Sequence, residues 1–160
     1  MPDLATGYVV DKAELRDLVV GRWVETTMPA LRAIAARPEP ARRQLRRLFD
    51  ALICLKRRRA ADAPELFAAY RTLATDAHSV VAAHVRELVA LAATIIRSGV
   101  KEGALRSVDP VAAGRAILFA TSRFHHPAHA AEWIDPSIDA AYNEVWRLLM
   151  DGLCVAKRPH

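Results

Sequence analysis

Three histidines within five residues form the densest group of side chains in this chain that could do chemistry. His125, His126 and His129 flank Pro127, and on a helical turn His125 and His129 share one face at a spacing that suits a metal ion. No Cys is close, and Asp135 is a downstream carboxylate. Pro127 favours a helix end, where imidazoles bond terminal carbonyls. We expect a structural or interface role, with metal binding by His125 and His129 as the weaker alternative.

The other reactive side chains do not form a catalytic set. His84 lies on an apolar helical stripe, as either a hydrogen-bonded core histidine or a polar group in a ligand cavity. Cys54 and Cys154 lack C-x-x-C spacing, and we expect Cys54 to be a small buried residue. The chain has no Gly-rich phosphate loop, no G-x-S-x-G and no H-E-x-x-H. We expect neither an enzyme nor a bound cofactor.

Positive charge is concentrated in one segment. The formal net charge is +5, and residues 32–59 contain ten Lys and Arg against Glu39 and Asp50. This segment is either a solvated helix face or a surface that attracts phosphate, acidic lipid or an acidic partner.

Length and composition indicate one helical domain that positions these groups. The chain has 160 residues, 52% of them hydrophobic, and its 31 Ala exceed its 6 Gly and 9 Pro, which favours helix over strand. The longest apolar segments are interrupted by Arg, Glu or His, and the start lacks the pattern of a secretion signal. We expect a cytoplasmic protein with no membrane partner.

Cap residues and hydrophobic periodicity predict six helices and no strand. A first helix starts near Asp11, repeats Leu15, Leu18, Val19, Trp23 and Leu31 at helical intervals, kinks at Pro29 and ends at 37–40. A second helix covers about 39–59, and residues 62–65 open a short third one. A fourth covers about 76–97 and is closed by Gly99 or Gly103. The fifth covers about 109–124 and the sixth 138–155, with a loop or short turn over 125–135 between them. In the second helix we expect Leu45, Leu48, Phe49, Leu52 and Ile53 inward and Arg42, Arg43, Arg46, Arg47 and Lys56 largely outward.

The last two helices contain more apolar residues than one buried stripe requires. We expect them to pair across a two-fold axis as a four-helix contact in a homodimer. The candidate interface residues are Gly114, Ile117, Phe124, Tyr142, Trp146 and Leu149. The alternative is a central helix buried within one chain.

The head and tail of this helix order resemble the tetracycline-repressor (TetR) family of bacterial transcription regulators. The head, residues 8–15, is similar to the family's signature at the entrance to its fourth helix, and the tail, residues 121–136 with the final helix, resembles one regulatory-domain subgroup. The resemblance implies an all-α, six-helix regulatory domain over 11–160, with 1–10 as a remnant of the end of the DNA-binding domain. It also implies DNA-phosphate contacts at Tyr8 and Lys12.

In the family, three helices that include a helix-turn-helix precede this signature, whereas ten residues precede Asp11. We therefore expect DNA binding without sequence preference unless such a unit lies upstream. The resemblance also favours an internal cavity for a small apolar or aromatic ligand, although the same residues could fill a dry core. The candidate lining residues are Phe49, Ile53, Phe67, Tyr70, His84, Leu88 and Phe119.

The resemblance implies the ligand-sensing and dimerisation part of a TetR-like regulator. Two alternatives are a stand-alone helical module that forms heterodimers with a full-length regulator, and a small-molecule binding protein.

Overall fold

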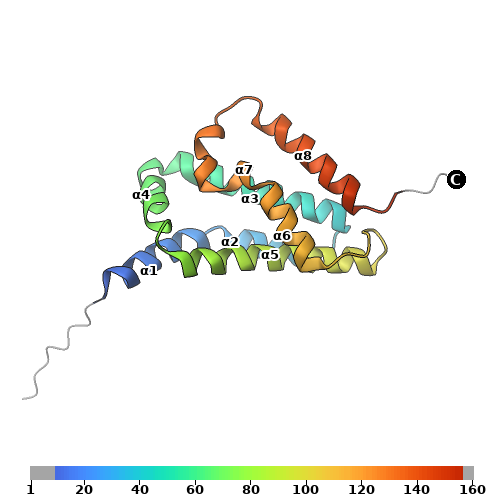
Figure 1. Ribbon diagram of the computed structural model, residues 1–160, viewed down its shortest axis with the longest axis horizontal. Coiled ribbons are helices and arrows are strands. Elements are labelled where there is room, and N and C mark those ends of the chain that lie inside the picture. The colour runs from blue at the N-terminus through green and yellow to red at the C-terminus, as the bar shows by residue number, and fades with distance from the viewer. Residues whose placement is uncertain (1–9, 157–160) are drawn as a thin grey trace, which may run out of the picture.

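Eight α-helices and one short 3-10 helix make up residues 10–156, the part of the chain that the computed structural model describes. In order they are α1 (Lys12–Glu25), α2 (Met28–Ala35), α3 (Ala41–Asp62), α4 (Pro64–Ala74), α5 (His78–Lys101), α6 (Pro110–Ala120), α7 (Ser122–His125), the 3-10 helix η1 (Pro127–Glu132) and α8 (Ile138–Leu153). Figure 1 shows an elongated bundle with α4 at one end. The predicted all-α fold is confirmed.

Two of the predicted helices are each divided in the structure. The first breaks before Met28 instead of kinking at Pro29. In a continuous helix Pro29 would lack an N–H to donate and its ring would clash with the carbonyl of Glu25, where α1 ends. The fifth breaks at Thr121, whose buried hydroxyl donates to the Ile117 carbonyl. The predicted loop that follows contains η1. These differences explain why the described residues contain more than six helices.

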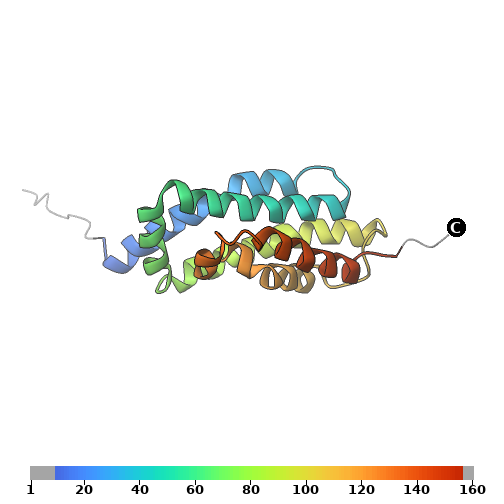
Figure 2. The same ribbon diagram turned by 90° about the horizontal axis from the view of Figure 1, so that it is seen from above.

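Helix α5 is the central helix of the bundle. It packs against α1, α2, α3 and α6, and both ribbon views show it running along the molecule (Figures 1 and 2). Within residues 10–156 it is the one helix long and apolar enough, by length and composition alone, to cross a membrane. Its buried stripe faces other helices of the same chain, so packing inside the bundle accounts for its apolar character.

The main core contains residues from α2, α3, α5, α6, α7 and α8. Phe49 of α3 and Trp146 of α8 have ring centroids 5.5 Å apart, and Tyr142 meets Phe124 at 5.3 Å. Gln44 is buried, and its side-chain amide donates to the Ile34 and Ala35 carbonyls at the end of α2 and to the Arg37 carbonyl just after it, which satisfies acceptors at that helix terminus.

Two glycines shape the end of α5. Gly103 has a φ of 74° and follows the last turn, so it is the residue that ends the helix. Gly99 lies inside α5, where an added Cβ would stand 2.6 Å from side-chain atoms of Ala41 and Leu105. Gly99 therefore allows close packing and does not end the helix.

Some predicted apolar positions lie on the surface. Leu15, Leu18 and Val19 of α1 are exposed, whereas Val20 is fully buried. The predicted burial of Cys54 is wrong: the residue is exposed. It follows the buried Ile53 on α3, and one residue turns the side chain by about 100° around a helix.

Candidate ligand-binding site

A second, smaller core lies at the end of the bundle where α1 meets α4. Four aromatic side chains gather there: Trp23 from α1, Phe67 and Tyr70 from α4, and Trp133 from the segment after η1. The Trp23 and Tyr70 rings are stacked with centroids 5.2 Å apart, and those of Phe67 and Trp133 lie 6.1 Å apart. Phe67 and Tyr70 face the same side because they are three residues apart on a helix.

These rings surround a small cavity of about 10 Å³, which is room for about one water molecule. It is lined by Trp23, Val24, Thr27, Lys56, Arg59, Phe67, Tyr70, His84, Pro127 and Trp133. Two larger surface hollows adjoin it. One of about 270 Å³ shares Tyr70 and Pro127 with the cavity, and one of about 360 Å³ shares Val24 and His84. Few side chains therefore separate the cavity from open space.

Lys56 lies in the cavity wall, so the prediction that it points outward is wrong. It follows the buried Leu52 by four residues and the buried Ile53 by three, and this spacing puts it on the inward face of α3. Desolvation lowers the pKa of its ammonium from 10.5 to about 8. Within residues 10–156 Lys56 forms no ion pair.

His84 and Arg59 add two further donor groups to the wall. His84 is 7% exposed, and neither of its ring nitrogens has a hydrogen-bond partner in the described part of the chain. Burial, and then the Lys56 charge, lower the pKa of His84 to about 3, so its ring is neutral at pH 7. Arg59 lies over Trp23, with Cζ 3.8 Å from the ring centroid, and donates to the Trp23 carbonyl and the Thr26 hydroxyl.

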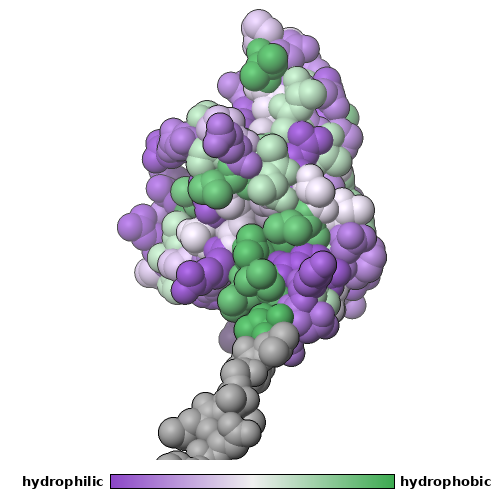
Figure 3. All heavy atoms as spheres, turned by 90° about the vertical axis from the view of Figure 1, so that its left-hand side faces the viewer, coloured by the Kyte–Doolittle hydropathy of each residue, from purple (hydrophilic) through white to green (hydrophobic). Residues whose placement is uncertain are grey.

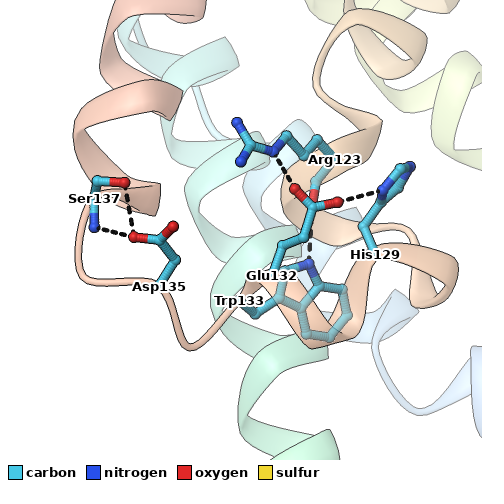
Figure 4. Close-up of polar contacts among 6 residues, drawn as sticks. All are labelled: Arg123, His129, Glu132, Trp133, Asp135 and Ser137. Carbon is cyan, nitrogen blue, oxygen red and sulfur yellow. Dashed lines mark hydrogen bonds and ion pairs between the residues drawn. The ribbon is translucent and has the colours of Figure 1, made fainter.

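A polar network holds the wall that η1 and Trp133 form (Figure 4). The Glu132 carboxylate accepts a hydrogen bond from Arg123 Nε at 2.5 Å and lies 2.9 Å from His129 Nδ1. Arg123 first, and then His129, lower the pKa of Glu132. The Trp133 indole N–H donates to the Arg123 carbonyl at 3.0 Å. Glu132 and Trp133 therefore tie η1 to α7.

The histidine cluster separates into different environments. His125 is buried, and its Nε2 lies 3.2 Å from both the Leu118 carbonyl and the Thr121 hydroxyl. A carbonyl only accepts, so Nε2 carries the proton. Burial and the Lys56 charge lower the pKa of His125 to about 3. His129 instead faces Glu132, and among the described residues no group of three or more His, Cys, Asp or Glu could hold a metal ion.

The predicted cavity residues fall into three places. Phe67, Tyr70 and His84 line the cavity, and the absence of a hydrogen-bond partner for His84 favours the cavity role over that of a satisfied core histidine. Phe49, Ile53 and Leu88 belong to the main core. Phe119 is 59% exposed, so its predicted place in a cavity is wrong. Its neighbours Ile117 and Leu118 take the inward positions of α6.

Most of the predicted dimer residues are buried within the chain. Ile117, Phe124, Tyr142 and Trp146 belong to the main core, Gly114 packs closely on α5, and Leu149 packs partly buried against the core. These side chains are not available to a partner, because α6 and α8 turn their inward faces toward the core. The large apolar side chains exposed on the two helices are Val111 and Phe119 on α6 and Leu148 on α8.

The basic face of α3 is largely solvated. Arg46 pairs with Asp50 at 2.8 Å and Arg47 with Glu39 at 3.0 Å, and exposed pairs of this kind contribute little to stability. Lys12, the candidate phosphate contact, is exposed at the start of α1. Its companion Tyr8 lies outside the described residues.

An apolar patch covers the first turns of α1. Val10, Leu15, Leu18 and Val19 are between 42% and 59% exposed. Figure 3 looks onto this end of the molecule and shows apolar side chains gathered there. Patches of this kind mark contact surfaces.

Sequence reasoning missed seven cavity residues, and four of them supply rings or charges: Trp23, Lys56, Arg59 and Trp133. For Lys56 and Arg59 a signal existed, because they continue the inward spacing of Phe49 and Leu52 along one helix. Trp133 directly follows the 3-10 helix η1, and its place depends on tertiary packing between distant segments.

Comparison with known proteins gives one match. The profile of a family described as "Tetracyclin repressor-like, C-terminal domain" matches residues 41–146, about two thirds of the chain. No curated protein and no solved structure matches.

Proposed function

The chain belongs to the family of tetracycline-repressor-like C-terminal domains, and from this premise we propose that it senses a small ligand and forms a homodimer as part of a transcriptional regulator. The observation that carries the proposal is the aromatic cavity. Its wall contains the desolvated Lys56, and His84, whose ring nitrogens have no hydrogen-bond partner within residues 10–156. A packed core has no need of such groups, whereas a ligand site uses a few polar groups among apolar walls. TetR-family regulators are soluble, and we propose a cytoplasmic location.

The cavity must enlarge to admit a ligand, since typical ligand pockets measure roughly 300 Å³ or more. The wall best suited to move is η1 with Trp133, because η1 is a short 3-10 helix and Pro127 also borders the hollow of about 270 Å³. Moving η1 would pull on Arg123 in α7, which follows α6 directly. We propose that this connection carries the ligand signal to the dimer helices.

We propose that α6 and α8 form the dimer contact through their exposed residues. The end of α8 is tied to the segment between α5 and α6: the Arg106 N–H donates to the Leu153 carbonyl at 2.9 Å, and the Val155 N–H donates to the Ala104 carbonyl at 3.2 Å. Phe119 and Leu148 supply exposed apolar area on α6 and α8. Such a self-complementary patch closes with two-fold symmetry.

Size-exclusion chromatography with light scattering tests the dimer. The unchanged protein should elute as a dimer at micromolar concentration, and Leu148→Glu should shift it to monomer by placing an unpaired charge in the contact. Leu66→Glu is the matched control, since Leu66 is 65% exposed on α4, at the other end of the molecule. A stable monomer of the unchanged protein, or equal effects of the two variants, would contradict the proposed interface.

For DNA, residues 10–156 offer Lys12 as a candidate phosphate contact. One ammonium gives a salt-sensitive contact without sequence preference. We propose that the apolar patch on α1 is where a DNA-binding unit of the family packs when one is present. A footprint on one operator by this chain at physiological salt would contradict a purely non-specific role.

A further inference from the structure

The cavity wall contains basic side chains without a carboxylate among the described residues to balance their charge. Lys56 and Arg59 of α3 and His84 of α5 line it, and no Asp or Glu of the described residues does. Arg59 is occupied by the Trp23 ring and two oxygen acceptors. In the described part of the chain, Lys56 forms no ion pair and neither ring nitrogen of His84 forms a hydrogen bond.

Two of the histidines near Lys56 are neutral and add no charge to this interior. His84 of α5, His125 of α7 and His126 after α7 lie close enough for the Lys56 charge to lower the pKa of each. The pKa values of His84 and His125 fall to about 3, so both rings are neutral at pH 7. The pKa of Lys56 is about 8, so its ammonium is still protonated at pH 7. A desolvated cation without a counter-ion is costly, and a bound anion would relieve that cost.

Granted the proposed sensor function, we infer that the ligand is an aromatic carboxylate, with its acid group on Lys56 and His84 and its ring among the aromatic side chains. The ammonium would form the ion pair, and an imidazole N–H of His84 would donate a second hydrogen bond to the carboxylate. The ring would pack among Trp23, Phe67 and Trp133.

Binding should depend on pH through Lys56. A carboxylate on the ammonium raises its pKa above 8, so binding is strongest below about pH 8 and weakens as the free ammonium loses its proton above it. Of the other groups that face this site, His84 and His125 have pKa values of about 3, and burial raises the pKa of Tyr70, so these three stay neutral between pH 7 and 9.5. Burial lowers the pKa of His126 and that of Arg59.

Isothermal titration of the whole chain with 2-naphthoate and with its neutral amide, 2-naphthamide, tests the inference. At pH 7 the acid should bind about 10- to 100-fold more tightly than the amide, as hydrogen bonds to charged groups allow. At pH 9.5 the affinity of the acid should fall by more than about tenfold. Lys56→Met should abolish the preference for the acid, and Lys101→Met, at an exposed position at the end of α5, should preserve it.

The results separate this inference from the proposed function. Equal binding of acid and amide, or a preference for the acid that survives Lys56→Met, overturns the carboxylate inference and leaves the sensor proposal standing. If neither compound binds but a neutral aromatic compound from a wider panel does, the carboxylate inference is likewise overturned and the sensor proposal stands. If no aromatic compound binds to the folded dimer, both the inference and the sensor proposal fail.

Discussion

Replacing Lys56 with Met should make the unliganded protein more stable. Lys56 presents a desolvated ammonium to a cavity with aromatic walls and has no ion pair within residues 10–156. Met has a similar length and flexibility and no charge to desolvate. The substitution therefore removes an electrostatic cost and retains most of the packing of α3 against the second core.

The size of the effect follows from the pKa of Lys56. A fall from 10.5 in the unfolded chain to about 8 in the folded protein corresponds to about 3 kcal/mol of destabilisation by the charged form. Because the folded pKa is the lower one, this cost is fully present below pH 8. It disappears as the pH rises from about 8 to 10.5. At pH 7 we expect Lys56→Met to raise the thermal midpoint by roughly 6 to 12 °C, taking about 2 to 4 °C per kcal/mol.

Urea denaturation followed by circular dichroism at pH 7 and pH 9.5 measures this prediction. The free energy of unfolding of the unchanged protein should rise between pH 7 and pH 9.5, because the folded protein no longer holds a charged Lys56. The Lys56→Met protein should not show this rise. Lys101→Met, at an exposed position, should change stability by less than about 0.5 kcal/mol. A Lys56→Met protein less stable than the unchanged one at pH 7 would refute the reasoning.

Three further substitutions test the core and the cavity wall. Leu88→Ala should cost roughly 2 to 5 kcal/mol, because Leu88 is 6% exposed in the main core, and should leave 2-naphthoate affinity unchanged in titration calorimetry. Gly99→Ala should destabilise by about 1 to 3 kcal/mol, because its Cβ would stand 2.6 Å from two side chains; an unaltered thermal midpoint would contradict that packing. Glu132→Gln should speed ligand association, measured by stopped-flow tryptophan fluorescence, because it weakens the network that holds η1. An equal rate would show that the network does not limit opening.

The helix pattern was predictable because cap residues and periodicity agree. Asp109 illustrates this: its carboxylate accepts a hydrogen bond from the Ala112 N–H at 2.8 Å, and α6 starts at Pro110 as those residues indicate. Which face of a helix is buried was less predictable where the helix is apolar on all sides. Ile117 and Phe119 are both large apolar residues, yet the first is buried and the second exposed.

The candidate site was predictable only in part, for two physical reasons. Residue type and helical spacing conflict at Lys56: its charge favours solvent, whereas its position after Leu52 favours the interior, and here the spacing decides. Trp133 joins the cavity through packing between distant segments, which no local pattern contains. By contrast, Phe67 and Tyr70 were predictable because both the period and the residue type place them inward.

The most direct test of an aromatic carboxylate in this cavity is the response of the three tryptophan indole N–H signals to 2-naphthoate in two-dimensional ¹H–¹⁵N NMR. Trp23 and Trp133 line the cavity. Trp146 lies in the main core and also lines a surface hollow with the arginines of the basic face of α3, Arg42, Arg43, Arg46 and Arg47, so the tryptophans report on separate places. We predict that saturating 2-naphthoate shifts the signals of Trp23 and Trp133 and leaves that of Trp146 in place. A shift confined to Trp146 would place the anion on the arginine face of α3 and contradict the account, as would no shift at all.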